Sequence, residues 1–142
     1  MAEGDSRRRP ISRWKTLEFE DRESALRPRI YISGPITKGD RDVNFQQAAD
    51  AHKALMTAGY AVMNPMLTMR LPDAFEIPHG TWIANDLPWV AAADAVLRLP
   101  GESKGADIEC EHASIQGIPV FYDVAELQRF FSESQGRAKR YA

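Results

Sequence analysis

The sequence predicts one α/β domain built on an open parallel β-sheet, and two patterns of residues predict it. Short apolar runs rich in β-branched side chains, such as residues 29–33, alternate with longer segments whose apolar residues recur at helical spacing. Four such runs occur, and a helical segment separates each from the next. Strands joined by helices lie parallel and carry helices on both faces. We expect the strand order 2-1-3-4.

The first half of the domain shows clear boundary signals. Residues 29–33 (RIYIS) are β-branched and aromatic, as in a buried strand. The helix that follows begins near Asn44, with Asn44 or Asp42 as its N-cap, and Gly59 lies where a C-terminal cap belongs. A second strand at residues 60–65 is closed by proline.

The second half begins with an irregular segment, residues 66–80, which contains two prolines and a glycine as breakers. Residues 81–94 predict a helix, in which Pro88 should cost about 3 kcal/mol at an interior position. We therefore expect a kink, or a helix that restarts near Leu87. The remaining expected elements are a strand at 95–100, a helix ended by Gly117, a strand at 118–123 and a helix at 124–131.

Composition limits the classes of function. The chain has 142 residues, 44% of them hydrophobic, and a formal net charge of −2, which argues against a nucleic-acid-binding protein. A single cysteine, Cys110, excludes an internal disulfide. No apolar run is long enough to span a bilayer and no secretory signal opens the chain, so we expect a cytoplasmic protein.

Charge density divides the chain into three parts. Residues 1–28 are dense in charge and are expected to form a flexible arm, either a solvated tail or a segment that contacts nucleic acid. Residues 29–131 form the α/β domain. Residues 132–142 are expected to be a flexible C-terminal tail.

Ligands of an open parallel sheet bind at the carboxyl ends of its strands. The loop at residues 33–40 (SGPITKGD) follows the first strand and carries two glycines and a lysine. Glycines let a backbone approach a ligand, and the N-terminus of the next helix attracts an anion. A simple tight turn would explain the same residues, and the loop alone does not decide between the two.

Glu109 lies in the helix that follows the third strand, at the same edge of the sheet. The helix dipole alone favours a carboxylate near a helix N-terminus by about 0.3–1 kcal/mol. The residues before Glu109, however, include Ser103, Gly105 and Ala106, which are small and leave room for a bound molecule. This combination suggests a nucleophile or a general base.

Four stretches occur in order at suitable spacing: IYISGP (30–35), GYAVMNP (59–65), NDLPWVAAADAV (85–96) and SKGADIECEHA (103–113). Through them, the chain from Arg29 to about Tyr122 resembles the nucleoside 2-deoxyribosyltransferase superfamily. The resemblance is closest to small phage-type members and to nucleoside 5′-monophosphate N-glycosidases. It implies a flavodoxin- or Rossmann-like form of the sheet described above.

The resemblance also implies roles for individual residues. Glu109 holds the position of the nucleophile, Tyr31 that of a tyrosine that orients it, and Asp86 that of an aspartate that helps to place sugar or base. Relatives often carry arginine where this chain has Thr37, and the adjacent Lys38 supplies charge but not a bidentate fork. The implied substrate-binding residues are Ser33, Gly34, Pro35, Ile36, Thr37, Lys38, Gly39, Ser103, Gly105 and Ala106.

The resemblance implies an enzyme that cleaves the N-glycosidic bond of a nucleoside 5′-monophosphate or a deoxynucleoside and passes the sugar to water. It requires no metal and no organic cofactor. One alternative is 2-deoxyribosyl transfer between nucleobases; another is a nucleotide-binding module without catalysis. Trp82 or Trp89 could stack on a base or lie in a subunit contact. We expect a homodimer or a larger even oligomer, because relatives complete the pocket from an adjacent subunit.

Overall fold

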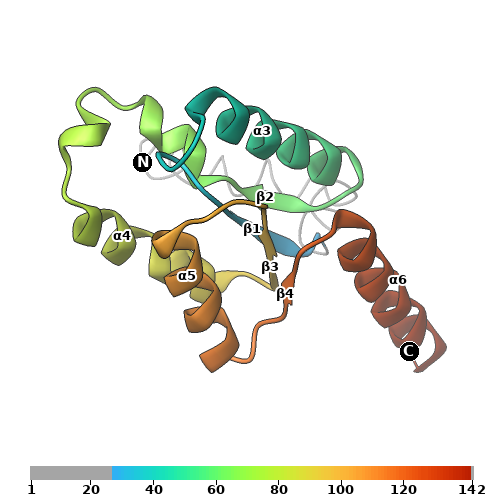
Figure 1. Cartoon of the computed structure of the whole chain (residues 1–142). Coiled ribbons are helices and arrows are strands. Elements are labelled where there is room, and N and C mark those ends of the chain that lie inside the picture. Colours follow the sequence, from blue (N-terminus) through green and yellow to red (C-terminus); the bar gives the residue numbers. More distant parts are fainter. Residues whose placement is uncertain (1–26, 142) are drawn as a thin grey trace, which may run out of the picture.

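The computed structural model describes residues 27–141, and it describes side chains as far as residue 133. The expected arm at residues 1–28 lies almost wholly outside these residues. All pairings in the four-stranded sheet are parallel, and the order is β2-β1-β3-β4 (Figure 1), as predicted. The elements are β1 (Arg29–Ser33), α3 (Arg41–Thr57), β2 (Ala61–Met63), the 3₁₀ helices η1 (Pro65–Arg70) and η2 (Ala74–Glu76), α4 (His79–Ala92), β3 (Ala95–Arg98), α5 (Lys104–Ile115), β4 (Val120–Phe121) and α6 (Val124–Tyr141).

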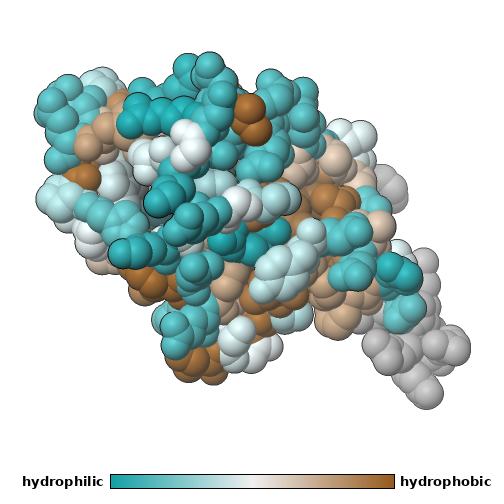
Figure 2. Space-filling model, in the orientation of Figure 1, coloured by the Kyte–Doolittle hydropathy of each residue, from teal (hydrophilic) through white to brown (hydrophobic). Residues whose placement is uncertain are grey.

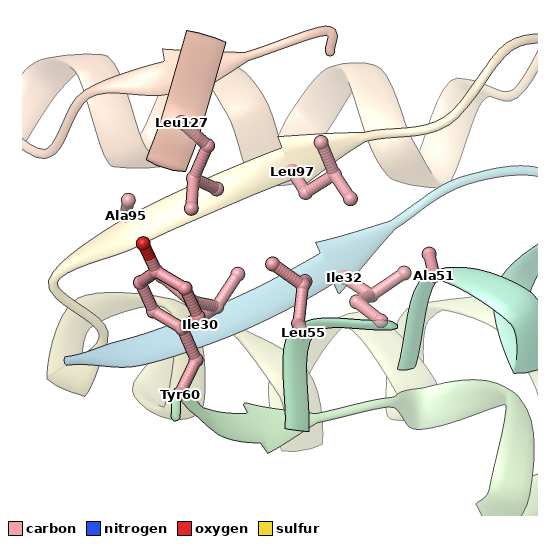
Figure 3. Close-up of a cluster of buried hydrophobic side chains, with 8 residues drawn as sticks. All are labelled: Ile30, Ile32, Ala51, Leu55, Tyr60, Ala95, Leu97 and Leu127. Atoms are coloured by element: carbon pink, nitrogen blue, oxygen red, sulfur yellow. The ribbon is translucent and has the colours of Figure 1, made fainter. Parts of the chain in front are cut away.

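Helices cover both faces of the sheet, α3 and α6 on one and α4 and α5 on the other. Successive residues of a strand point to opposite faces. Ile30 and Ile32 of β1 therefore pack with Leu55 of α3 and Leu127 of α6 (Figure 3). Tyr31 points the other way, toward α4 and α5. This alternation places the polar side chains of β1 on the α4–α5 face.

The first helix begins earlier than predicted. Its N-cap is Asp40, whose carboxylate accepts hydrogen bonds from the backbone N–H groups of Asp42 and Val43. Asn44, which we expected as a possible cap, is instead buried within the helix. Its amide donates to the carbonyl oxygens of Ile36 and Lys38, at 3.2 and 2.8 Å. The predicted start is too late because asparagine is suited both to cap a helix and, as Asn44 does here, to bond to the carbonyl oxygens of the preceding loop.

Helix α4 is continuous through Pro88 and does not restart near Leu87. A proline at this position removes the hydrogen bond to the carbonyl four residues earlier, at Ala84. Ala84 and Pro88 are both exposed, so water can hydrate that carbonyl. After the helix, Asp94 accepts a hydrogen bond from the backbone N–H of Arg29 at 2.7 Å, which ties the start of β3 to β1.

Helix α6 is longer than predicted. The sequence predicts its end at residue 131, but the helix continues to Tyr141, so the segment expected as a C-terminal tail is largely helical. The sequence after residue 131 contains no proline and is rich in residue types that favour a helix. The expectation relied on the end of the apolar pattern, and a polar segment can continue a helix without it.

The surface is polar over most of the face seen in Figure 2, including the outer side of α3. Hydrophobic surface appears near the C-terminal end of α5, where Ile115 is 73% exposed. None of the helices within residues 27–141 is long and apolar enough to cross a membrane.

Candidate active site

A buried carboxylate lies against β1. Helix α5 packs on the face of the sheet toward which Tyr31 and Ser33 point, and it directs Glu109 at both. The Tyr31 hydroxyl donates to Glu109 Oε2 at 2.5 Å, and the Ser33 hydroxyl donates to Glu109 Oε1 at 2.7 Å. Glu109 is only 6% exposed. Each carboxylate oxygen is thus held by one hydroxyl group.

The surroundings of Glu109 act on its ionisation in both directions. Burial raises the pKa of Glu109 above its ordinary value, while the hydrogen bonds from Tyr31 and Ser33 act to lower it. The negative charge of Asp86 adds to the increase and the guanidinium of Arg98 opposes it. The pKa of Tyr31 is raised by burial and by the charge of Glu109, so its hydroxyl stays protonated and remains a donor.

A cavity of about 490 Å³ opens beside Glu109 at the carboxyl ends of the strands. Its walls include the loop after β1, residues 34–38, and the first turn of α5, residues 103–106. Glu109 and Asp86 both line it, so two buried carboxylates face one space. Burial raises the pKa of Asp86, against a hydrogen bond from Asn85 that lowers it.

Most of the predicted site residues lie on this cavity. Tyr31 and Ser33 do not line it, but both bond to Glu109, which does. Gly39 does not line it either; it forms the turn before α3, with φ of 79°. The predicted residues on the cavity wall are Gly34, Pro35, Ile36, Thr37, Lys38, Asp86, Ser103, Gly105, Ala106 and Glu109.

Ser103 has a structural function as well as a place on the cavity. It is the N-cap of α5, and its hydroxyl oxygen accepts a hydrogen bond from the backbone N–H of Ala106 at 3.1 Å. The backbone N–H groups of Lys104 and Gly105, in the first turn, have no partner within the helix. The positive end of α5 therefore borders the cavity. Lys38 also borders it and lies 3.8 Å from Glu102, both side chains being largely exposed.

One wall of the cavity was not predicted. The segment we expected to be irregular supplies apolar side chains from η1 and η2, including Met66, Met69 and Phe75. Their place could not be read from the sequence, because nothing in residues 66–80 fixes how the segment turns.

The structure separates the two tryptophans. Trp82 lines the cavity, and its indole N–H donates to the carbonyl oxygen of Ala74 at 3.0 Å. Trp89 is 53% exposed and lies outside the cavity. His79, at the start of α4, also borders the cavity. Trp82 is thus the tryptophan that could contact a ligand there.

A larger cavity, of about 670 Å³, lies along α5 and the loop after β3. It is lined by Arg98, Cys110 and Tyr122, among others, and by none of the predicted site residues. Arg98 there binds the carbonyl of Gly101 at 3.0 Å and the carboxylate of Asp107 at 3.2 Å. We place the site at the smaller cavity because two buried carboxylates line it. Within the described residues no cluster of three or more His, Cys, Asp or Glu side chains could hold a metal ion.

Two of the loops that form the cavity meet at Gly101. Its φ is 114°, and a Cβ atom built on it would lie 2.8 Å from Cγ of Pro35. Gly101→Ala should therefore lower the free energy of unfolding by about 1–3 kcal/mol, from backbone strain and displacement of Pro35. Gly117→Ala is the control: φ is 76° but no atom lies within 4 Å, so only backbone strain applies. Urea titrations measure both, and an equal loss would contradict the contact with Pro35.

Comparison with protein families gives a match over residues 28–122, to the family described as "Domain of unknown function (DUF4406)". The chain belongs to the DUF4406 family. No curated protein gave a significant match. Among solved structures, this DUF4406 protein is similar to one described as a 2-deoxyribosyltransferase from Bacillus psychrosaccharolyticus. The two are 23% identical, with a TM-score of 0.51 over 68% of this chain and 75% of the other. That similarity establishes a shared fold.

Proposed function

We propose that this protein cleaves the N-glycosidic bond of a nucleoside 5′-monophosphate or a deoxynucleoside, with Glu109 as nucleophile and water as the final acceptor. One observation carries the proposal: a buried carboxylate, held at both oxygens, faces a cavity that a second buried carboxylate shares. A carboxylate that is removed from water and fixed in direction is suited to attack a bound carbon atom. The shared fold with a 2-deoxyribosyltransferase supports the same chemistry.

In the first step, a lone pair of Glu109 forms a bond to the anomeric carbon while the bond from that carbon to the base nitrogen breaks. The bonding electrons leave with the base, which must gain a proton. Asp86 lines the same cavity, and its raised pKa suits it to hold a proton for the leaving base. Asp86, ionised once the base has left, then accepts a proton from water as the water oxygen attacks the anomeric carbon of the glycosyl ester; the bond from that carbon to Glu109 breaks, the Glu109 carboxylate is regenerated, and the configuration of the sugar is retained.

A 5′-phosphate would find positive groups at the rim. Lys38, Lys104 and the N-terminus of α5 all border the cavity. The ion pair between Lys38 and Glu102 is exposed, and such pairs contribute little, so a phosphate can compete with Glu102 for the lysine. A deoxynucleoside without phosphate would not use this part of the cavity.

Incubation with a panel of nucleosides and 5′-monophosphates, followed by chromatography, tests the function. Release of free base with one of these substrates is the expected result. Addition of a second nucleobase tests the alternative of 2-deoxyribosyl transfer, which the fold similarity favours: a new nucleoside would then form. If no base is released but nucleotide binds, the protein is a binding module. Assembly into an even homo-oligomer and a cytoplasmic location stay predictions.

The pH dependence should reflect Glu109. Only the carboxylate form attacks, and burial raises the pKa of Glu109 above its ordinary value. The acid limb of kcat/KM should therefore lie at a higher pH than an exposed glutamate would give. Initial rates of base release across the acid and neutral range measure it. A rate that stays constant down to the ordinary pKa of glutamate would contradict a buried nucleophile.

A further inference from the structure

The carboxylate of Glu109 is held from two successive positions on the same face of β1. Tyr31 and Ser33 are two residues apart, which is the spacing that brings neighbouring side chains of a strand to one face. Each gives its hydroxyl proton to a different oxygen of Glu109. The terminal torsion of a glutamate is broad when nothing restrains it. One bond fixes one oxygen, and the second bond fixes the plane of the carboxylate.

We propose that Ser33 is a positioning residue for Glu109, which acts with Tyr31 to fix both oxygens of the carboxylate. The part of this inference that concerns catalysis rests on the proposed function. The part that concerns the carboxylate itself does not, because it can be measured without a substrate. Ser33 was expected to touch the substrate; its bond to Glu109 assigns it to the nucleophile instead.

The surroundings of Ser33 leave its hydroxyl few other partners. The side chain is 0% exposed, so water does not reach it. Its other partners are the carbonyl oxygen of Ala106, at 3.5 Å, and the neighbouring Cys110 thiol, whereas Glu109 Oε1 lies at 2.7 Å. The shorter bond, to a charged acceptor, is the stronger one. Ser33 also lies in β1 beside Arg98 of β3, so strand pairing fixes its backbone.

The groups that face Glu109 explain why a neutral hydroxyl matters there. Burial and the charge of Asp86, on α4, both disfavour the carboxylate form of Glu109. Tyr31 of β1 and Arg98 of β3 favour it, and so does Ser33. The neighbouring Cys110 thiol stays neutral, because burial raises its pKa. Removal of Ser33 would take away one of three groups that oppose the burial of the charge.

Ser33→Ala tests the proposal. Hydrogen bonds to charged groups are strong enough that the loss should raise the pKa of Glu109 by about one unit or more. NMR titration of the carboxyl carbon in protein labelled at glutamate, without substrate, measures this shift; the Glu109→Gln spectrum assigns the signal. With substrate, kcat should fall by about 10- to 100-fold with little change in KM, and the acid limb should move to higher pH by the same shift.

Two further variants make the result specific. Ser33→Thr restores a hydroxyl and should bring back the parent titration of Glu109. Ser114→Ala removes an exposed hydroxyl from α5, the helix that carries Glu109, and should change neither the titration of Glu109 nor kcat. If Glu109 titrates in Ser33→Ala as in the parent protein, the proposal is overturned whether or not a substrate is known. If the titration shifts but the parent protein releases no base, the proposed function fails and the role of Ser33 stands.

Discussion

Glu109→Gln is expected to reduce the release of base by about four orders of magnitude or more, because the amide cannot form the glycosyl ester. Substrate should still bind, since glutamine has nearly the same shape and the cavity wall is unchanged. Rates of base release and an equilibrium binding measurement separate the two effects. Base release at the parent rate would show that Glu109 is not the nucleophile.

Two companion measurements sharpen this test. Tyr31→Phe removes the 2.5 Å hydrogen bond to Glu109 but leaves the nucleophile, so it should reduce the rate of base release less than Glu109→Gln does. A slow 2-fluoro substrate analogue should leave one sugar on the protein, and peptide mapping should locate it on Glu109. A sugar on any other residue would contradict the assignment.

Glu109→Gln, which should nearly abolish base release, should not lower the stability of the fold. Because the pKa of Glu109 is raised in the folded state, the folded protein binds a proton more tightly there than the unfolded chain does. This group therefore contributes stability at low pH and loses it as the pH rises through its folded pKa. At neutral pH Glu109→Gln should unfold at the same or a higher temperature than the parent. The difference in unfolding temperature between the variant and the parent should be smaller at acid pH.

The second large effect concerns the core. Leu55 of α3 is 0% exposed and packs with Ile30 and Ile32 of β1 (Figure 3). Leu55→Ala should lower the free energy of unfolding by about 2–5 kcal/mol, through lost burial and the cavity left behind. Met56→Ala is the matched control: its side chain is 50% exposed, and it should change stability by about 0.5 kcal/mol or less. Urea unfolding measures both.

An equal loss of unfolding free energy in Leu55→Ala and Met56→Ala would show that α3 does not pack as described. A loss below 1 kcal/mol for Leu55→Ala would mean that the face covered by α3 and α6 contributes little to stability. Activity serves as a second reading, because Leu55 lies on the opposite face of β1 from Glu109. The folded fraction of Leu55→Ala should keep the parent kcat.

Much of the fold follows from the sequence because its signals are local. The β-branched run at residues 29–33 and the alternation of strands and helices predict a parallel sheet, and the structure has it in the predicted order. The residues at which helices begin and end are less well predicted by the sequence. Asn44 has the right chemistry for an N-cap but serves the loop before the helix, and Pro88 lies where water can replace its missing hydrogen bond.

Some parts of the candidate site could likewise be predicted from the sequence, and others could not. Glu109 and the loops at the carboxyl ends of the strands could be found, because a parallel sheet brings those ends together. The apolar wall from η1 and η2 could not, since its path depends on contacts distant in sequence. The bond from Ser33 to Glu109 was within reach: Tyr31 was expected to meet Glu109, and alternation along the strand places Ser33 on the same face.

The alternation of β1 also restricts how the chain can change in length. Insertion or deletion of one residue just before Tyr31 would exchange the two faces of the strand. Isoleucine would then face Glu109, and two hydroxyl groups would enter the apolar layer beneath α3 and α6. Point substitutions in β1 can harm packing or chemistry separately, but a change of one residue in length harms both together. Variation in length should therefore be tolerated in the exposed turns and excluded from this strand.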